Sequence, residues 1–152
     1  MPHARLAGPG DLAFVRDTTL AAYSSYLPVL GMMPLPVEAD HAATIAAGHV
    51  WLVSDGGVDV GLMVLEQAAD HLMIESLVVL PGHQGQGLGQ WMLDFAAVRA
   101  RAAGVLEIQL YTNALMTRNI GIYQKFGFVE TGRRPTPHRP GFIRVYMTKP
   151  LP

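Results

Sequence analysis

Alternating hydrophobic and polar positions mark several segments of this chain as half-buried strands. The pattern predicts strands at residues 3–7, 50–54, 58–66, 71–80, 105–112, 128–132 and 142–149. Asp55-Gly56-Gly57 separates the second segment from the third and is a strong hairpin signal. We therefore expect the three strands between residues 50 and 80 to be antiparallel neighbours.

A second set of segments carries apolar residues at helical spacing. The pattern predicts helices at residues 11–26, 36–47, 88–103 and 116–126. Pro9-Gly10-Asp11 is typical of a helix start, with Asp11 as the N-cap or a first-turn acid. A glycine follows each of the other three segments and is expected to end it: Gly48, Gly104 and Gly127.

Two segments look irregular. Residues 27–36 hold three prolines and the pair Met32-Met33, and we expect an unusually apolar loop there. Residues 133–141 are polar and proline-rich, so they are expected to connect the last two strands.

The order of the elements constrains the sheet. The strand at 71–80 reaches the strand at 105–112 through a single helix. Such a crossover makes the two strands parallel, and the connection itself is almost always right-handed. The sequence therefore predicts a mixed sheet of the α/β (α+β) class. Its length favours a single domain over residues 1–152.

Composition narrows the class of protein. Half of the residues are hydrophobic and 15% are charged, which is typical of a compact globular protein rather than a disordered one. The formal net charge of −1 disfavours a nucleic-acid partner. Cysteine is absent, which excludes disulfides and a thiolate nucleophile, and the scattered histidines lead us to expect no metal. Neither a signal peptide nor a membrane-length apolar stretch is recognisable, so we expect a cytoplasmic protein with no membrane partner.

The most informative segment is Gln84-Gly85-Gln86-Gly87-Leu88-Gly89, between a predicted strand and a predicted helix. A glycine turn in that place aims main-chain N–H groups at a phosphate. Gln90-Trp91 follows where a nucleoside-triphosphate loop needs lysine and then serine or threonine. The last glycine of a dinucleotide fingerprint is also missing. A phosphorylated ligand of another kind is therefore expected.

The pattern Gln-x-x-Gly-x-Gly resembles the acyl-CoA loop of the GNAT family of N-acetyltransferases. The preceding run 74–81, the run 119–128 with its Tyr-x-x-x-Gly-Phe end, and the closing run 141–147 are similar to further family motifs. The resemblance covers nearly the whole chain. It implies a mixed, mostly antiparallel seven-stranded sheet with a central parallel pair that splays apart, flanked by about four helices.

The resemblance also implies how acetyl-CoA would be bound as co-substrate. The main chain of Leu77, Val78 and Val79 would pair with pantetheine like an added strand. The turn residues would hold the pyrophosphate through their amides: Gln84, Gly85, Gln86, Gly87, Leu88 and Gly89. Asn119 would contact the cofactor or cap its helix. Because Met116 stands where the family most often has asparagine, Asn119 or Asn113 would replace it.

Acetyl transfer to an amine needs a base, an oxyanion partner and an acid for the departing thiolate. Glu75 is the candidate base, directly or through a water, although it would equally suit a solvent-facing strand position. His71 is a weaker candidate. The resemblance places Tyr123 beside the CoA sulfur as the acid, against the alternative of a core aromatic. A main-chain amide at Val78 or Val79 would meet the oxyanion.

The acceptor side is expected to involve two groups of residues. Tyr26, Leu30, Met32 and Met33 would form an adaptable apolar wall, or else pack on the core or on a second copy in a homodimer. The late basic residues would attract an acidic acceptor or the CoA 3′-phosphate, or form a solvated loop: Arg133, Arg134, His138, Arg139 and Arg144.

The function expected is direct transfer of the acetyl group, in a ternary complex, to a primary amine of a small molecule or peptide. The alternative is a non-catalytic acyl-CoA-binding or regulatory module.

Overall fold

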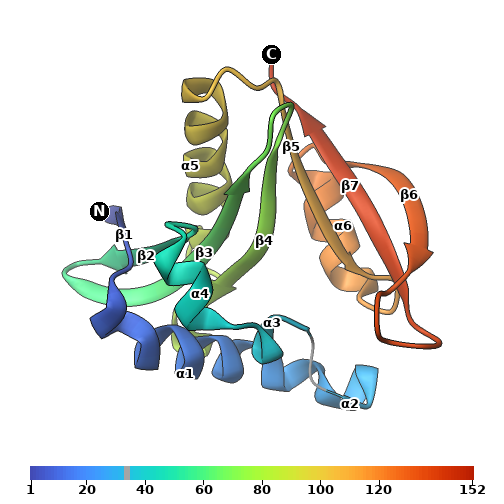
Figure 1. The fold of residues 1–152 in the computed structure, drawn as a ribbon, viewed down its shortest axis with the longest axis horizontal. Coiled ribbons are helices and arrows are strands. Elements are labelled where there is room, and N and C mark those ends of the chain that lie inside the picture. The colour runs from blue at the N-terminus through green and yellow to red at the C-terminus, as the bar shows by residue number, and fades with distance from the viewer. Residues whose placement is uncertain (33–34) are drawn as a thin grey trace. The chain divides into compact units, whose positions relative to one another are not determined.

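The computed structural model describes residues 1–32 and 35–152 of the chain. Within them a seven-stranded sheet has the order β1-β2-β3-β4-β5-β7-β6 (Figure 1). Its strands are β1 (Pro2–Leu6), β2 (Val50–Asp55), β3 (Val58–Gln67), β4 (Leu72–Val79), β5 (Glu107–Asn113), β6 (Val129–Pro135) and β7 (Ile143–Pro150). β4 and β5 are parallel, while β2 pairs antiparallel with β1 and β3, and β7 with β5 and β6. The predicted mixed sheet with a central parallel pair is confirmed.

The helices of the described residues agree with the sequence pattern in the second half of the chain and differ in the first. They are α1 (Leu12–Tyr23), α2 (Leu27–Leu30), α3 (Leu35–Glu38), α4 (His41–Ala46), α5 (Leu88–Ala102) and α6 (Thr117–Lys125), with 3-10 turns at Pro9–Asp11, Ser24–Tyr26 and Pro81–His83. The prediction of a plain loop at 27–36 is wrong at its start, where α2 forms one turn that ends at Gly31 with a φ of +73°.

The predicted helix 36–47 is also wrong, because Asp40 divides it. Asp40 has a non-helical ψ of 88°, and its carboxylate accepts a hydrogen bond from the Ala43 amide at 3.1 Å. This is the geometry of an N-cap, so a new helix, α4, begins at His41. Asp11 does not cap α1 in this way: its carboxylate instead accepts hydrogen bonds from the Gly8 amide at 2.8 Å and from Arg5.

The first helix ends three residues earlier than expected, at Tyr23. The Ser24 hydroxyl donates to the Leu20 carbonyl at 2.6 Å, and the Ser25 hydroxyl donates to the Ala22 carbonyl at 3.3 Å. Serine hydroxyls that compete for helix carbonyls weaken the regular ladder. The chain therefore tightens into a 3-10 turn there.

The chain forms two compact units, of which the first comprises Met1–Glu66 and Glu75–Asp94. Its core joins α1 and α4 to β2, β3 and β4. The buried members of this core are Val15, Ile45, Val50, Leu52, Leu62 and Val78. The segment Val60–Met63 of β3 is buried at every position, which shows that both faces of this strand are covered.

The second unit comprises Gln67–Ile74 and Phe95–Pro152. It holds the parallel pairing of Leu72–Ile74 with residues 108–110 of β5, and α6 lies alongside its strands in Figure 1. Alternation divides the β5–β7 ladder into two faces. The apolar face is buried through Ile108, Leu110, Val145 and Met147. The other face is polar and half-buried, and its members are Gln109, Tyr111, Asn113, Arg144, Tyr146 and Thr148.

Gly61 on β3 allows a close approach of β4 inside the first unit. A Cβ at this position would lie 2.3 Å from the Val78 carbonyl oxygen, which is closer than real Cβ contacts. The Leu80 amide also donates to the Val60 carbonyl at 2.8 Å. The end of β4 is therefore fixed against β3 by main-chain atoms, and only glycine fits at position 61.

Gly61→Ala should consequently push β4 away from β3. Because a main-chain oxygen cannot rotate aside as a side chain can, we expect a loss of about 1–3 kcal/mol in the free energy of unfolding in urea. Gly132→Ala is the matched control, since Gly132 also lies in a strand and its Cβ would meet nothing within 4 Å. Equal stability of the two variants would contradict this account.

Candidate functional site

The end of β4 passes directly into the predicted phosphate loop. After β4 the chain makes the 3-10 turn Pro81–His83, in which the His83 amide donates to the Leu80 carbonyl at 2.8 Å. The Gln84 side chain then reaches back, and its Nε2 donates to the Val79 carbonyl at 3.1 Å. Gln84 thus ties the loop to the strand from which it emerges.

The loop has the conformation that its glycines permit. Gly85 and Gly87 have φ values of +77° and +82°, in the left-handed region that L side chains rarely adopt. The first α5 amide with a helical acceptor is Trp91, which donates to the Gly87 carbonyl at 3.1 Å. The amides before Trp91 are those that a helix leaves without an intrahelical partner, and they carry the positive end of the helix dipole. The arrangement is chemically suited to an anion.

Leu77, Val78 and Val79 lie on β4 as predicted. Val78 is 1% exposed and its carbonyl is directed at Gly61 on β3, while Leu77 and Val79 are half-buried. In a strand the main-chain groups of neighbouring residues face opposite edges. The main chain of Leu77 and Val79 is therefore directed to the edge away from β3.

A residue that the sequence pattern did not single out contacts this part of β4. Tyr23, the last residue of α1, shares a hydrogen bond of 3.2 Å between its hydroxyl and that of Ser76. Burial raises the pKa of the Tyr23 phenol, and hydrogen bonds with Ser76 and with the Leu77 main chain oppose that rise. Tyr23 therefore remains a neutral phenol, held against two consecutive residues of β4.

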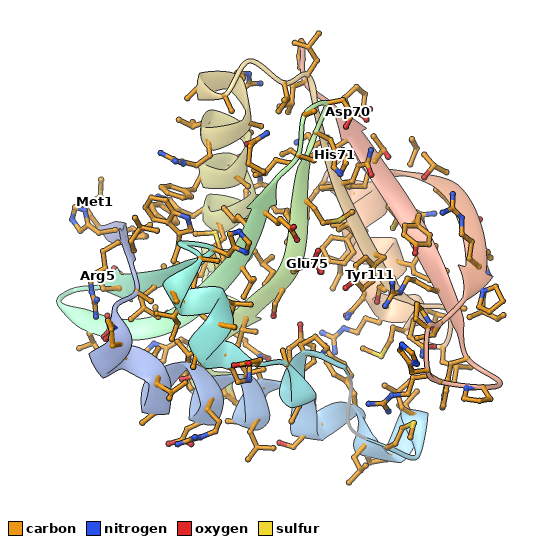
Figure 2. The ribbon with its side chains drawn as sticks, in the orientation of Figure 1. Met1, Arg5, Asp70, His71, Glu75 and Tyr111 are labelled. Carbon is orange, nitrogen blue, oxygen red and sulfur yellow. The ribbon has the colours of Figure 1, made fainter. Side chains whose placement is uncertain are left out.

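Glu75 lies on β4, half-buried, one residue before the Ser76 that Tyr23 contacts (Figure 2). The buried residues of β4 are Leu72, Ile74, Ser76 and Val78, so alternation puts Glu75 on the other face of the strand. His71, the weaker candidate base, lies before β4 in the turn, where its Nδ1 is 2.6 Å from the Asp70 carboxylate (Figure 2). This contact lowers the pKa of Asp70.

Tyr123 belongs to the second unit, and the hydrogen bonds at the end of α6 fix its position there. The Phe128 amide donates to the Tyr123 carbonyl at 3.0 Å, and the Gly127 amide donates to the Gln124 carbonyl at 3.1 Å. These two bonds, with a φ of +96° at Gly127, form a Schellman motif. Phe128 is 1% exposed, and its ring packs edge-on against Tyr123 with 5.8 Å between centroids. The Gly-Phe pair of the sequence motif thus fixes the Tyr123 ring.

The two candidate asparagines have different settings. Asn113 at the end of β5 uses its carboxamide oxygen to accept the Leu115 amide at 2.9 Å, which stabilises the turn before α6. Asn119 lies on α6 one helical turn before Tyr123, so the two share a face. Met116 is buried at the N-cap position.

The residues expected on the acceptor side fall into separate environments. Leu30 is buried, Met32 is 39% exposed, and the Tyr26 ring lies 5.8 Å from that of Tyr23. Met33 lies outside the described residues. Leu30 thus belongs to the interior, as the alternative of packing on the core requires, and Met32 lies at the surface.

The late basic residues also separate. Arg133 pairs with Glu130 at 2.9 Å, and Arg139 is buried in the connection between β6 and β7. Arg134 and Arg144 instead lie over tyrosine rings on β5 and β7.

In residues 1–32 and 35–152 no three acidic or histidine side chains gather closely enough to hold a metal ion. The same residues contain no helix with the length and apolarity needed to cross a membrane.

Comparison with known proteins gives one family match and several relatives. Residues 46–130 match the model of an acetyltransferase (GNAT) domain. A streptothricin acetyltransferase of Streptomyces lavendulae is 28% identical over 121 residues, which are 76% of this chain and 61% of that protein. An IAA acetyltransferase of Azospirillum brasilense is 28% identical over 94 residues, or 62% of this chain and 61% of that protein. The matches thus span about three fifths of these curated relatives.

The fold is similar to that of the PaiA N-acetyltransferase of Thermoplasma acidophilum, solved in complex with coenzyme A. The TM-score is 0.79 at 15% sequence identity, and the match covers 99% of both chains. At this identity the likeness concerns the fold alone.

The Tyr23–Ser76 hydrogen bond can be tested by a double-mutant cycle. Tyr23→Phe and Ser76→Ala each remove one partner, and we expect each to lower the free energy of unfolding by about 1 kcal/mol. Because both changes abolish the same contact, the double variant should lose less than the sum, with a coupling of about 0.5–1.5 kcal/mol. Urea unfolding of the four proteins measures it, and strictly additive losses would show that the contact contributes nothing.

Proposed function

Because this chain belongs to the GNAT acetyltransferase family, we propose that it transfers the acetyl group of acetyl-CoA directly to a primary amine of a small molecule or peptide. The observation that supports acetyl-CoA as the acetyl donor is the geometry of the Gln84–Gly89 loop. It combines two left-handed glycines, the N-terminus of a 15-residue helix and a tie from Gln84 to β4. Such a cradle suits the pyrophosphate of CoA.

The main chain of β4 suits the rest of the donor. The main chain of Leu77 and Val79 faces the edge away from β3, where pantetheine would add as a strand does to the groups that Gln84 and Tyr23 do not already bond. The Val78 carbonyl is directed at Gly61, which favours Val79 over Val78 as the amide that meets the oxyanion. An amide held by a fixed strand needs no reorganisation when charge develops.

In the proposed reaction the amine nitrogen attacks the acetyl carbonyl carbon, and the carbon–sulfur bond then breaks. Glu75 takes the amine proton, directly or through a water, and the Tyr123 hydroxyl gives a proton to the departing thiolate. Asn119, on the same face of α6 as Tyr123, is the proposed side-chain contact to CoA. The chain has no cysteine to carry the acetyl group, which favours direct transfer in a ternary complex.

Gly87→Val should abolish CoA binding. A branched side chain at this left-handed position costs roughly 1–2 kcal/mol in strain and occupies the space over the loop amides. Gly57→Val is the matched control, because Gly57 has the same φ of +82°, has open space around it and lies in the β2–β3 hairpin. Calorimetric titration with CoA should show binding by Gly57→Val only, with similar melting temperatures for both variants. Retained CoA affinity in Gly87→Val would refute the donor assignment.

Tyr123→Phe separates an enzyme from a non-catalytic acyl-CoA-binding module. The variant keeps the ring contact with Phe128 and removes only the hydroxyl. We expect kcat to fall on the order of a hundredfold, with the Kd for CoA within about twofold of the parent value. CoA release against a panel of amines and peptides, with acceptor-free hydrolysis as baseline, measures kcat. An unchanged rate would remove the acid role, and no acceptor-dependent release from the parent protein would favour the module.

A further inference from the structure

Two arginines and two tyrosines gather on the polar face of the second unit, and we name Tyr111, Arg134, Arg144 and Tyr146 the Arg–Tyr cluster. The Arg144 guanidinium carbon lies 3.8 Å from the centroid of the Tyr111 ring (Figure 2 labels Tyr111). The Arg134 guanidinium carbon lies 4.9 Å from the Tyr146 ring. The two rings are tilted, with 5.8 Å between centroids.

The strand register explains this grouping. Tyr111 on β5 is directly opposite Tyr146 on β7, and Arg134 on β6 is directly opposite Arg144 on β7. Residues two apart on a strand share a face, so all four side chains emerge on the same side of the sheet. The residue opposite Tyr146 on β6 is Gly132, which leaves the ring open for Arg134 to cover.

The Arg–Tyr cluster contains two positive charges and no carboxylate that would neutralise them. Like charges directly opposite in a β-ladder are destabilising, yet Arg134 and Arg144 occupy such a pair. Among the described residues, no carboxylate lies within ion-pair distance of Arg134 or Arg144, whereas Arg5 and Arg133 each have at least one. Arg144 donates to the Tyr146 hydroxyl at 3.4 Å, which uses one of the five N–H donors of its guanidinium. Two oriented cations with donors to spare suit an anion.

The chemistry of the cluster suits a carboxylate. Guanidinium groups match the planar, two-oxygen geometry of a carboxylate, and the tyrosine rings on which they lie hold the two cations in place. Tyr111 is the first residue of β5 after the three that pair with β4. The cluster therefore begins where the parallel pairing ends, at the carboxyl end of β5, and in open α/β sheets ligands bind beyond the carboxyl ends of the strands.

We propose that the Arg–Tyr cluster binds a carboxylate of the acetyl acceptor, so that the acceptor is an amine that also carries a carboxylate, such as an amino acid or an acidic peptide. This inference rests on the proposed function, and it adds the class of acceptor. The role of the two arginines is to hold the substrate, since they take no part in the proton transfers.

A binding experiment tests the cluster without acetyl transfer. Phenylacetate, a carboxylate with a flat apolar body, serves as the probe, and its binding to the full chain is followed by NMR chemical shifts of the protein. We expect Arg144→Gln to weaken binding about tenfold or more, because a charged hydrogen-bond partner is removed. Arg133→Gln is the matched control, since Arg133 neighbours the cluster in sequence but pairs with Glu130, and it should change binding by less than about twofold.

Two further variants distinguish a loss of phenylacetate binding from a loss of folding. Arg134→Gln changes an exposed residue of the sheet-edge strand β6 and should weaken phenylacetate binding several-fold without a change in melting temperature. Arg144→Lys keeps the charge but not the planar fork, and it should bind between the parent protein and Arg144→Gln. No binding by the parent protein, or an equal loss in Arg133→Gln and Arg144→Gln, would overturn the proposal.

A kinetic experiment distinguishes the acceptor from the donor as the source of the anion. Phenylalanine and phenylalanine amide are compared as acceptors in the CoA-release assay, and the parent protein should prefer the carboxylate at least about tenfold in kcat/KM, a preference that Arg144→Gln should remove. If Arg144→Gln instead raises the KM of acetyl-CoA and leaves that of 3′-dephospho-acetyl-CoA unchanged, the CoA 3′-phosphate is the ligand and the proposal is wrong. Phenylacetate binding without acetylation of any amine would retain the cluster as a site and reject the proposed function.

Discussion

The carboxyl half of β4 is the segment on which the proposed donor site depends, and β3 holds it through main-chain atoms. The Val78 carbonyl fills the space that a side chain at Gly61 would take, and the Leu80 amide is bonded to Val60. Contacts between main chains leave no rotamer through which the strand can relax. β4 therefore delivers the glycine loop in one place, and Gln84 closes the arrangement by bonding Val79 from within the loop.

The second unit uses a different device to fix a side chain. The Tyr123 ring is set by the end of its helix, where the Schellman bonds at Gly127 turn the chain and bury Phe128 against it. The glycine is required because its φ of +96° lies in the left-handed region that L side chains rarely adopt. The Gly127-Phe128 pair of the sequence motif thus has a conformational reason at both of its positions.

Local pattern predicted most of the fold, because strand alternation is strong where one face is buried. β4 alternates between buried and half-buried at each of its eight residues. The break at Asp40 was not predictable, since aspartate is only mildly unfavourable inside a helix and its capping depends on the chain around it. The contact of Tyr23 with Ser76, 53 positions apart, leaves no mark in a local window. Arg133 and Arg134 look equivalent in sequence, yet alternation on β6 sends one to Glu130 and the other to Tyr146.

The proposed donor and acceptor sites place different demands on the sequence. Most of the proposed donor contacts are main-chain amides and carbonyls, which any sequence supplies once the glycines and Gly61 allow the backbone path. Such a site can persist in proteins that share little identity, because few side chains are specified. The contacts of the proposed acceptor site come from side chains instead, which a sheet surface can exchange without disturbing the core. The Arg–Tyr cluster lies on such a surface, on the face opposite the buried residues of β5 and β7, so a change in its charges would alter the acceptor while the donor loop and the fold stayed the same.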